Sequence, residues 1–258
     1  MSTSQIGGDT GARAGFGAVL ADLENAQKPG AGVPAYTRWV NRRAARVVAA
    51  AAVHAGIGPN VVSLLSALVS FAGLALLALV PAGWTVGVAA ACLLALGYIM
   101  DSADGQVARV TGTGSPAGEW LDHVIDAVRT PALHLVVLIG FHRWFDAGPA
   151  LLLLPLAFSL LAVGHFMSQI LAEQLGRQLA SATPGRRTAA PAEASLGKGP
   201  AWSVLMLPVD TGTMCWLFVL WGSPALFTAC YALLFAVHLV FACISAARKF
   251  KSLHGGAK

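Results

Sequence analysis

Charged residues are scarce in this sequence. Lys, Arg, Asp and Glu make up 11% of its 258 residues, whereas hydrophobic residues make up 56%. Soluble domains carry about 25% charged residues, so this composition argues against a soluble protein and indicates that lipid is the solvent. The segments of about ten residues with alternating hydrophobicity that build an outer-membrane barrel are also absent. The sequence therefore predicts an all-α integral membrane protein, because helices satisfy their backbone hydrogen bonds within one segment.

Cysteine is rare as well. Cys92, Cys215, Cys230 and Cys243 all lie in apolar runs, and no two of them form a CxxC pair. This arrangement argues against a zinc site and is typical of small buried side chains. The net charge is +5, but the basic residues lie at the ends of the apolar runs. That placement favours membrane lipids over nucleic acid as the partner.

The apolar runs are long enough for six membrane-spanning helices, each of which needs roughly 20 residues. They lie within a predicted catalytic domain over residues 56–247. Before it, residues 34–55 combine arginines with tryptophan and valine and predict an N-terminal amphipathic juxtamembrane helix. Residues 1–33 are predicted to be a disordered tail, and residues 248–258 a basic cytoplasmic tail. The expected spans cover residues 60–80, 84–107, 118–141, 149–175, 203–221 and 224–247.

The distribution of Lys and Arg predicts the orientation of these spans. With a cytoplasmic N-terminus, nearly all basic residues fall in cytoplasmic segments; Arg143 falls in an outside loop and Arg129 within a span. The positive-inside rule therefore places both termini, and the turn between the second and third spans, in the cytoplasm. The Ala- and Arg-rich, Lys-poor composition indicates a bacterial protein, and hence a multi-pass protein of the cell (inner or plasma) membrane.

Four aspartates interrupt the apolar pattern at the turn between the second and third spans. Asp101 and Asp104 are three residues apart near the end of one predicted helix. Asp122 and Asp126 are four residues apart near the start of the next. Residues at these spacings share one helix face. Residues 112–118, rich in glycine and containing a proline, predict a chain reversal, so two antiparallel helices are expected to bring the four carboxylates together.

Like charges in a low-dielectric site do not stay ionised together without cations. The segment offers few cations to pair with these carboxylates, which argues against a set of interhelical salt bridges. An all-oxygen ligand set suits hard ions, so we expect a site for Mg²⁺ or Mn²⁺, occupied by two ions. Gly105 allows a phosphate or sugar to approach the backbone closely. The guanidinium of Arg109 can fork onto a phosphate.

The segment resembles the signature of the CDP-alcohol phosphotransferase (CDP-alcohol phosphatidyltransferase) family, D-x2-D-G-x2-A-R-x8-G-x3-D-x3-D. The expected six-span topology and the preceding amphipathic helix are also similar to this family, so the resemblance covers roughly residues 35–247. Every fixed position matches with the spacing of the signature: Asp101, Asp104, Gly105, Ala108, Arg109, Gly118, Asp122 and Asp126.

The resemblance implies an enzyme of phospholipid biosynthesis. In the leading interpretation it transfers a phosphatidyl group from CDP-diacylglycerol to an alcohol or alcohol phosphate and releases CMP. An alternative keeps this chemistry with a soluble CDP-alcohol donor and a lipid or polyol-phosphate acceptor. A cation transporter is the non-enzyme alternative, and the absence of internal repeats argues against it. A homodimer is also expected from the resemblance.

The resemblance further implies roles for individual residues. Asp101, Asp104 and Asp122 would ligate metal, and Asp126 would share in ligation or act as the general base. Asp126 lies one turn deeper in its span than Asp122, which favours it as the base for the acceptor hydroxyl. The CDP moiety would be contacted by Gly105, Ala108 and Arg109.

Residues 59–63 resemble the P-N-x-x-T element of the family, with a serine at the hydroxyl position. Asn60 and Ser63 are therefore expected to contact the nucleotide. Helix N-capping is an equally good interpretation of Asn60.

Five further polar residues are candidate contacts of the acceptor alcohol: His165, Gln169, Arg186, Arg187 and Asp210. His165 and Gln169 share one face of the fourth span, where they would either meet the acceptor or satisfy helix contacts. Arg186 and Arg187 would suit an anionic acceptor, although positive-inside topology also explains them. Asp210 lies near the start of the fifth span, where a carboxylate is difficult to explain by packing alone.

Overall fold

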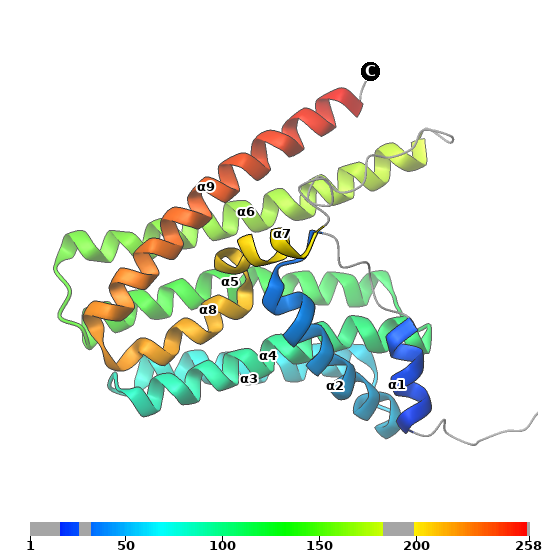
Figure 1. Cartoon of the computed structure of the whole chain (residues 1–258), viewed down its shortest axis with the longest axis horizontal. Coiled ribbons are helices and arrows are strands. Elements are labelled where there is room, and N and C mark those ends of the chain that lie inside the picture. Colours follow the sequence, from blue (N-terminus) through cyan, green and yellow to red (C-terminus); the bar gives the residue numbers. More distant parts are fainter. Residues whose placement is uncertain (1–15, 26–31, 183–198, 257–258) are drawn as a thin grey trace, which may run out of the picture.

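A computed structural model describes residues 16–25, 32–182 and 199–256, and every regular element within these ranges is helical. This confirms the all-α prediction. Figure 1 shows the helices arranged as an elongated bundle, with α6 and α9 diverging from the other helices toward their C-terminal ends. The elements are α1 (Phe16–Asn25), the π-helical turn η1 (Thr37–Asn41), α2 (Arg42–Ala55), α3 (Pro59–Leu79), α4 (Trp84–Thr111), α5 (Pro116–Arg143), α6 (Pro149–Ala182), α7 (Pro200–Leu205), η2 (Leu207–Val209), α8 (Thr211–Leu217), η3 (Phe218–Gly222) and α9 (Pro224–Gly256).

Among the described residues, five helices are long and apolar enough to cross a membrane: Pro59–Leu79, Trp84–Thr111, Pro116–Arg143, Pro149–Leu179 and Pro224–His254. They correspond to five of the six expected spans.

The remaining expected span, residues 203–221, is not one continuous helix. Pro208 has no backbone N–H to donate, and the Asp210 carboxylate caps a new helix, so the segment divides into α7, η2, α8 and η3. Its apolar part, Thr211–Gly222, is shorter than the other candidate spans. Because α6 and α9 run in the same direction, the chain between them returns along the bundle (Figure 1). A sixth membrane crossing stays a prediction.

Within the segment predicted to be disordered, Phe16–Asn25 forms helix α1, and residues 1–15 and 26–31 lie outside the described residues. Val19 and Leu23, one helical turn apart, are both buried, and α1 packs against the alanine-rich α2. Arg46 of α2 also lies 3.2 Å from Glu24. The sequence did not predict this helix because small and polar residues surround its single apolar turn. The described part of the predicted basic tail is helical, since α9 continues to Gly256.

Helix α3 occupies the centre of the fold around the predicted site. It packs against both α4 and α5, whereas the backbones of α4 and α5 approach each other closely at few points. Small residues permit the close approach of α3 and α4. A Cβ atom on Gly97 would lie only 2.1 Å from the Ser70 hydroxyl oxygen. Side chains rather than backbone contacts therefore bridge α4 and α5 over much of their length.

The end of the bundle remote from the predicted site is closed by an aromatic core. Phe141, Trp221, Phe227 and Tyr231 are fully buried there, and the rings of Trp221 and Phe227 meet edge to face with centroids 4.8 Å apart. Gly140 makes room for this core, because a Cβ atom at that position would lie 2.3 Å from the Trp221 ring. This packing anchors η3 and α9 against α5.

The juxtamembrane segment is helical across η1 and α2, and Asp210 ties its start to the bundle. The Asp210 side chain accepts hydrogen bonds from the Thr37 backbone N–H at 2.8 Å and the Thr37 hydroxyl at 2.7 Å. It also accepts one from the Gly212 N–H at 3.0 Å. Because the Thr37 hydroxyl donates to Asp210, the Tyr98 hydroxyl donates to Thr37 at 2.7 Å. One carboxylate thus connects η1, α4 and α8, and we call its hydrogen bonds with Thr37 and Gly212 the latch. Exposed Trp39, with Val40 and Val47, is suited to the membrane interface, which stays a prediction.

We expect Asp210→Ala to destabilise the protein. The change strips buried donors of Thr37 and Gly212 of their acceptor, which costs about 2–4 kcal/mol. Thermal unfolding of the detergent-purified protein measures the effect as a lower melting temperature. Asp22→Ala, at an exposed aspartate of α1, is the matched control. Equal melting temperatures for the two variants would contradict the latch.

Candidate active site

The chain reversal between α4 and α5 forms as the glycine-rich turn predicts. Gly112 ends α4 in the left-handed conformation, at φ 66°. Ser115 then caps α5 by accepting a hydrogen bond from the Gly118 N–H at 3.1 Å. The two helices run antiparallel, so the aspartates at the end of α4 face those at the start of α5 (Figure 1).

Three of the four aspartates converge. One carboxylate oxygen from each of Asp101, Asp122 and Asp126 lies within 4.8 Å of the other two, and all three residues are partly buried. This all-oxygen, anionic set fits a hard divalent cation. Asp104 lies outside this group. Its Oδ2 accepts a 2.5 Å hydrogen bond from the Ser63 hydroxyl, and its Oδ1 accepts one from the Gly105 N–H. Ligation by Asp104 stays a prediction.

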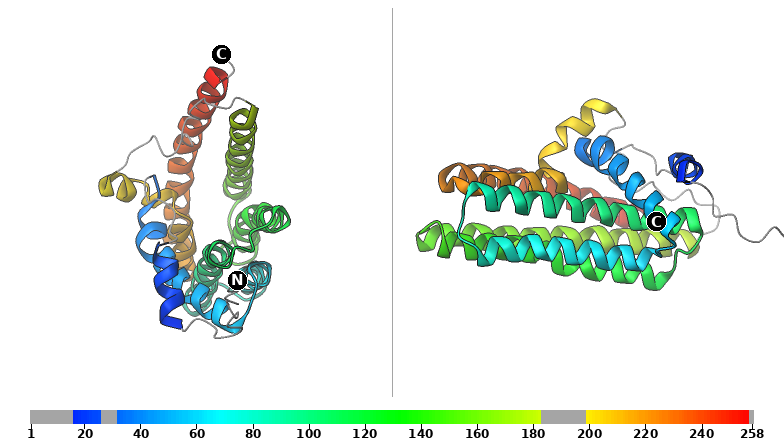
Figure 2. Two further views of the ribbon diagram at one scale, coloured as in Figure 1. Left: turned by 90° about the vertical axis from the view of Figure 1, so that its right-hand side faces the viewer. Right: turned by 90° about the horizontal axis from the view of Figure 1, so that it is seen from below.

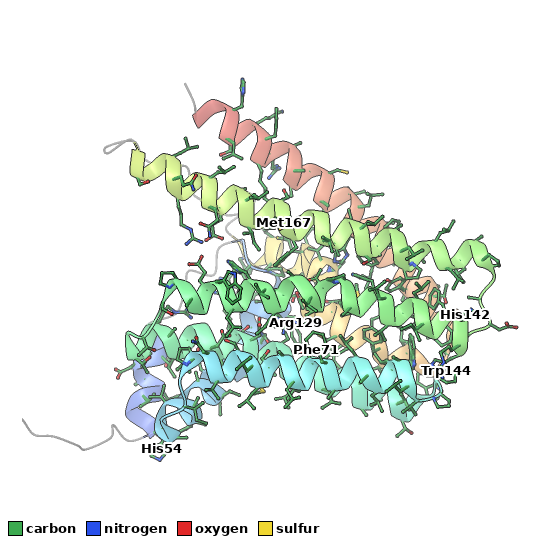
Figure 3. The ribbon with its side chains drawn as sticks, turned by 180° about the vertical axis from the view of Figure 1, so that it is seen from behind. His54, Phe71, Arg129, His142, Trp144 and Met167 are labelled. Atoms are coloured by element: carbon green, nitrogen blue, oxygen red, sulfur yellow. The ribbon has the colours of Figure 1, made fainter. Side chains whose placement is uncertain are left out.

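Arg129 supplies the cation that the sequence analysis did not assign to the carboxylates. Its Nη2 donates to Asp101 Oδ1 at 2.7 Å and also to Asp126 Oδ1. It therefore bridges α4 and α5 from a position midway along α5, on the side facing α3 (Figure 3). The expectation that few cations were available was wrong at this position. The sequence does indicate this ion pair. An arginine inside an apolar span is functional by default, and Arg129 lies three residues after Asp126, on the same helix face.

The predicted nucleotide contacts gather beside Asp104. A Cβ atom on Gly105 would lie 3.3 Å from Arg109 Nη1, so this guanidinium folds back over the glycine. Ala108 precedes Arg109 on the same helix and is partly buried. On α3, Ser63 contacts Asp104 directly.

Asn60 lies beside the start of α5. A Cβ atom on Gly118 would come within 2.9 Å of Asn60 Oδ1, so the glycine of the signature provides room for this side chain. The N-cap of α3 is Gly58 and Pro59 is the first helical residue, which makes the capping interpretation of Asn60 wrong. A nucleotide contact by Asn60 stays a prediction.

Arginines of the juxtamembrane segment lie next to this part of the site. The Gln106 side-chain amide of α4 donates to the Arg42 carbonyl at 3.4 Å. Burial lowers the pKa of the Arg42 guanidinium, and the nearby charge of Arg38 adds to the effect. Arginines in this position create a positive potential that favours an anionic substrate.

A cavity of about 320 Å³ extends from the carboxylates between α4, α5, α6, α8 and α9. His165 and Gln169, both predicted acceptor contacts, line it together with Asp101, Asp126 and Arg129. The Nε2 atoms of His165 and Gln169 are 3.2 Å apart. Much of the remaining wall is apolar and includes Leu94, Leu133 and Phe158, while His134 and His238 are polar residues in it.

The other predicted acceptor contacts are placed differently. The Asp210 carboxylate is 1% exposed and is bonded to Thr37 and Gly212, so the structure favours the latch over an acceptor contact. Arg186 and Arg187 lie outside the described residues.

Comparison with known proteins gives one family. A model of the CDP-alcohol phosphatidyltransferase family matches residues 57–245, most of the chain. The matched region holds all four aspartates, Arg129 and every residue that lines the cavity, but it begins after α2. A search of curated proteins found no match.

Proposed function

Because the chain belongs to the CDP-alcohol phosphatidyltransferase family, we propose that it transfers a phosphatidyl group from CDP-diacylglycerol to an alcohol with release of CMP. The family's activity is CDP-alcohol phosphotransfer in phospholipid synthesis. The observation that carries the proposal is the convergence of Asp101, Asp122 and Asp126 beside a cavity that opens between spanning helices.

The carboxylate cluster is proposed to hold the metal on which this family in general depends. Asp101, Asp122 and Asp126 supply oxygens, with Asp104 as a further ligand. Bound Mg²⁺ or Mn²⁺, two ions in our proposal, would neutralise charge on the diphosphate oxygens as the transferring group and CMP separate. The protein's own contribution is to fix the carboxylates: Ser63 orients Asp104, and Arg129 orients Asp101 and Asp126.

The donor is proposed to lie across the start of α3 and the end of α4. Gly105 and Ala108 leave space for the diphosphate to approach the helix, and Arg109 can fork onto its oxygens. Asn60 and Ser63 face the same region from α3, where they would contact the nucleotide.

Asp126 is proposed to accept the proton of the acceptor hydroxyl. Its Oδ1 bonds to Arg129 and would be the oxygen shared with metal, so Oδ2 is the one that would face the acceptor. The acceptor oxygen attacks the phosphorus that carries the lipid group, the bridging P–O bond breaks, and CMP leaves. His165 and Gln169 line the cavity next to Asp126 and would position the acceptor. The apolar wall around Leu133 and Phe158 supports a lipid-bearing substrate.

We further propose that the site faces the cytoplasm of a bacterial cell, with both termini on that side and the enzyme acting as a homodimer. The distribution of Lys and Arg supports this orientation. It gives water-soluble CMP a direct exit, while the lipid substrate arrives within the membrane.

CMP release by the purified protein tests the function. The protein is incubated with Mg²⁺, CDP-diacylglycerol and a panel of alcohols and alcohol phosphates, and CMP is quantified by chromatography. A parallel reaction with CDP-choline or CDP-ethanolamine and diacylglycerol tests the soluble-donor alternative. We expect CMP only when CDP-diacylglycerol is the donor. Release only from the soluble donors would favour the alternative, and no release from any pair would contradict transferase activity.

Asp126→Asn should lower turnover by a factor of about 10²–10⁴, because the amide cannot accept the hydroxyl proton. Donor binding, measured from protection against thermal unfolding by CDP-diacylglycerol, should largely persist. Asp146→Asn, at an exposed aspartate in the turn before α6, should leave both measurements unchanged. Full activity of the Asp126 variant would exclude it as the base.

Ser63→Ala should lower kcat/KM by about tenfold, because hydrogen bonds to charged groups contribute about 1.5–3 kcal/mol. The loss arises from a less well-oriented Asp104 carboxylate, so Ser63→Thr, which keeps the hydroxyl, should restore most of the activity. Ser181→Ala is the matched control on the exposed end of α6. Equal kinetics for the Ala variant and the wild type would remove Ser63 from the site.

A further inference from the structure

We propose that Arg129 is a built-in counter-cation that sets the affinity of the carboxylate site for divalent metal. This inference rests on the proposed metal-dependent function. It concerns the two ion pairs that Arg129 Nη2 makes with Asp101 and Asp126, which we call the fork. The fork joins two of the three carboxylates that converge, one from α4 and one from α5. A positive charge fixed at this point competes with any cation that binds the same groups.

The fork is partly enclosed by the helices around it. The side chain of Arg129 is 15% exposed, and those of Asp101 and Asp126 are 19% and 28% exposed. Ion pairs screened by water contribute little, whereas charges withdrawn from water act strongly on one another. The position of Arg129 within an apolar span therefore makes its charge a dominant local influence on the carboxylates.

Helix α3 fixes the other side of the guanidinium. Its Nη1 lies 3.3 Å from the Ser66 hydroxyl and 3.4 Å from the Ser70 hydroxyl. Ser66 donates its own proton to the Gly97 carbonyl at 2.9 Å, which leaves its oxygen to accept from Arg129. Both serines are buried, at 0% and 1% exposure. The guanidinium is thus held from three helices and cannot swing away without breaking buried hydrogen bonds.

This arrangement has a consequence that a purely structural ion pair does not have. The guanidinium engages Oδ1 of both Asp101 and Asp126, the same residues that offer oxygens to the metal. A metal ion at the cluster must therefore share its ligands with a fixed like charge, which weakens its binding. In return, the ion pairs hold the carboxylates of α4 and α5 together before metal arrives.

The two roles predict opposite effects of a neutral side chain. If Arg129 only holds the helices together, Arg129→Gln loosens the cluster and weakens metal binding. If its charge competes with the metal, the same change strengthens binding. Arg129→Lys distinguishes the effect of the charge from that of the guanidinium geometry, because it keeps the positive charge but loses the planar group.

The experiment is Mn²⁺ titration of the purified wild type and variants, followed by electron paramagnetic resonance of the free ion. We expect Arg129→Gln to bind Mn²⁺ at least about tenfold more tightly than the wild type, as removal of a nearby like charge implies. Arg129→Lys should stay close to the wild type. Unchanged or weaker binding by Arg129→Gln would overturn the proposal.

Arg143→Gln is the matched control. It makes the same change at the far end of α5, where Arg143 contacts the Ala78 carbonyl and stacks on Trp144. Its Mn²⁺ affinity should equal that of the wild type. If the Arg143 variant also bound Mn²⁺ more tightly, the effect would be one of overall charge, which would overturn a local role for Arg129.

A second measurement covers the case in which Arg129→Gln does not fold. Arg129→Ala is purified with methylguanidinium, which can occupy the vacated space between the carboxylates and serines. Increasing methylguanidinium should then weaken Mn²⁺ binding by this variant and leave the wild type unaffected. An Mn²⁺ affinity independent of methylguanidinium would overturn the proposal. Failure of the proposed reaction would show differently, as absent CMP release with Mn²⁺ binding intact.

Discussion

Repulsion among carboxylates is the constraint around which the bundle is organised. Oxygens of Asp101, Asp122 and Asp126 lie within 4.8 Å of one another. At an effective dielectric constant of about 20, each such pair of full charges repels by roughly 3–4 kcal/mol. The backbones of α4 and α5 approach closely at few points, so side chains have to oppose this repulsion. The positive charge of Arg129 and its hydrogen bonds across the gap oppose it, and a bound divalent cation would do so further.

Serines of helix α3 stabilise this cluster of charged side chains within the apolar bundle. Ser63, Ser66 and Ser70 lie on one face of an otherwise hydrophobic span and are all buried. The first donates to Asp104, and the other two accept from Arg129. Their small size also permits the tight α3–α4 contact at Gly97. One serine face therefore orients a carboxylate and the counter-cation of its neighbours, while the remaining face stays apolar. Figure 2 shows how α3, α4 and α5 lie together as the compact part of the bundle, from which α6 and α9 diverge.

Local sequence patterns predicted the parts of this design that depend on local geometry. Hydropathy identified the segments of α3, α4, α5, α6 and α9, and the three- and four-residue spacings anticipated the convergence of aspartates. The fork of Arg129 onto Asp101 was not predictable in this way, since 28 positions separate the two residues and their meeting depends on how the helices rotate. The division of residues 203–221 was missed for a different reason. Hydropathy registers the apolar content of that segment but not Pro208 or the capping carboxylate that follows it.

Asp210 shows how a polar residue can matter to the site without touching substrate. An isolated carboxylate near an apolar run indicated an acceptor contact, yet its partner is Thr37, 173 positions away. Through Thr37 it also orients Tyr98, which lies one turn before Asp101 on α4 and lines the cavity. The flanking residues Val209 and Thr211 line the same cavity. The latch therefore couples the juxtamembrane segment, which precedes the family match, to the wall of the cavity in which the acceptor is proposed to bind.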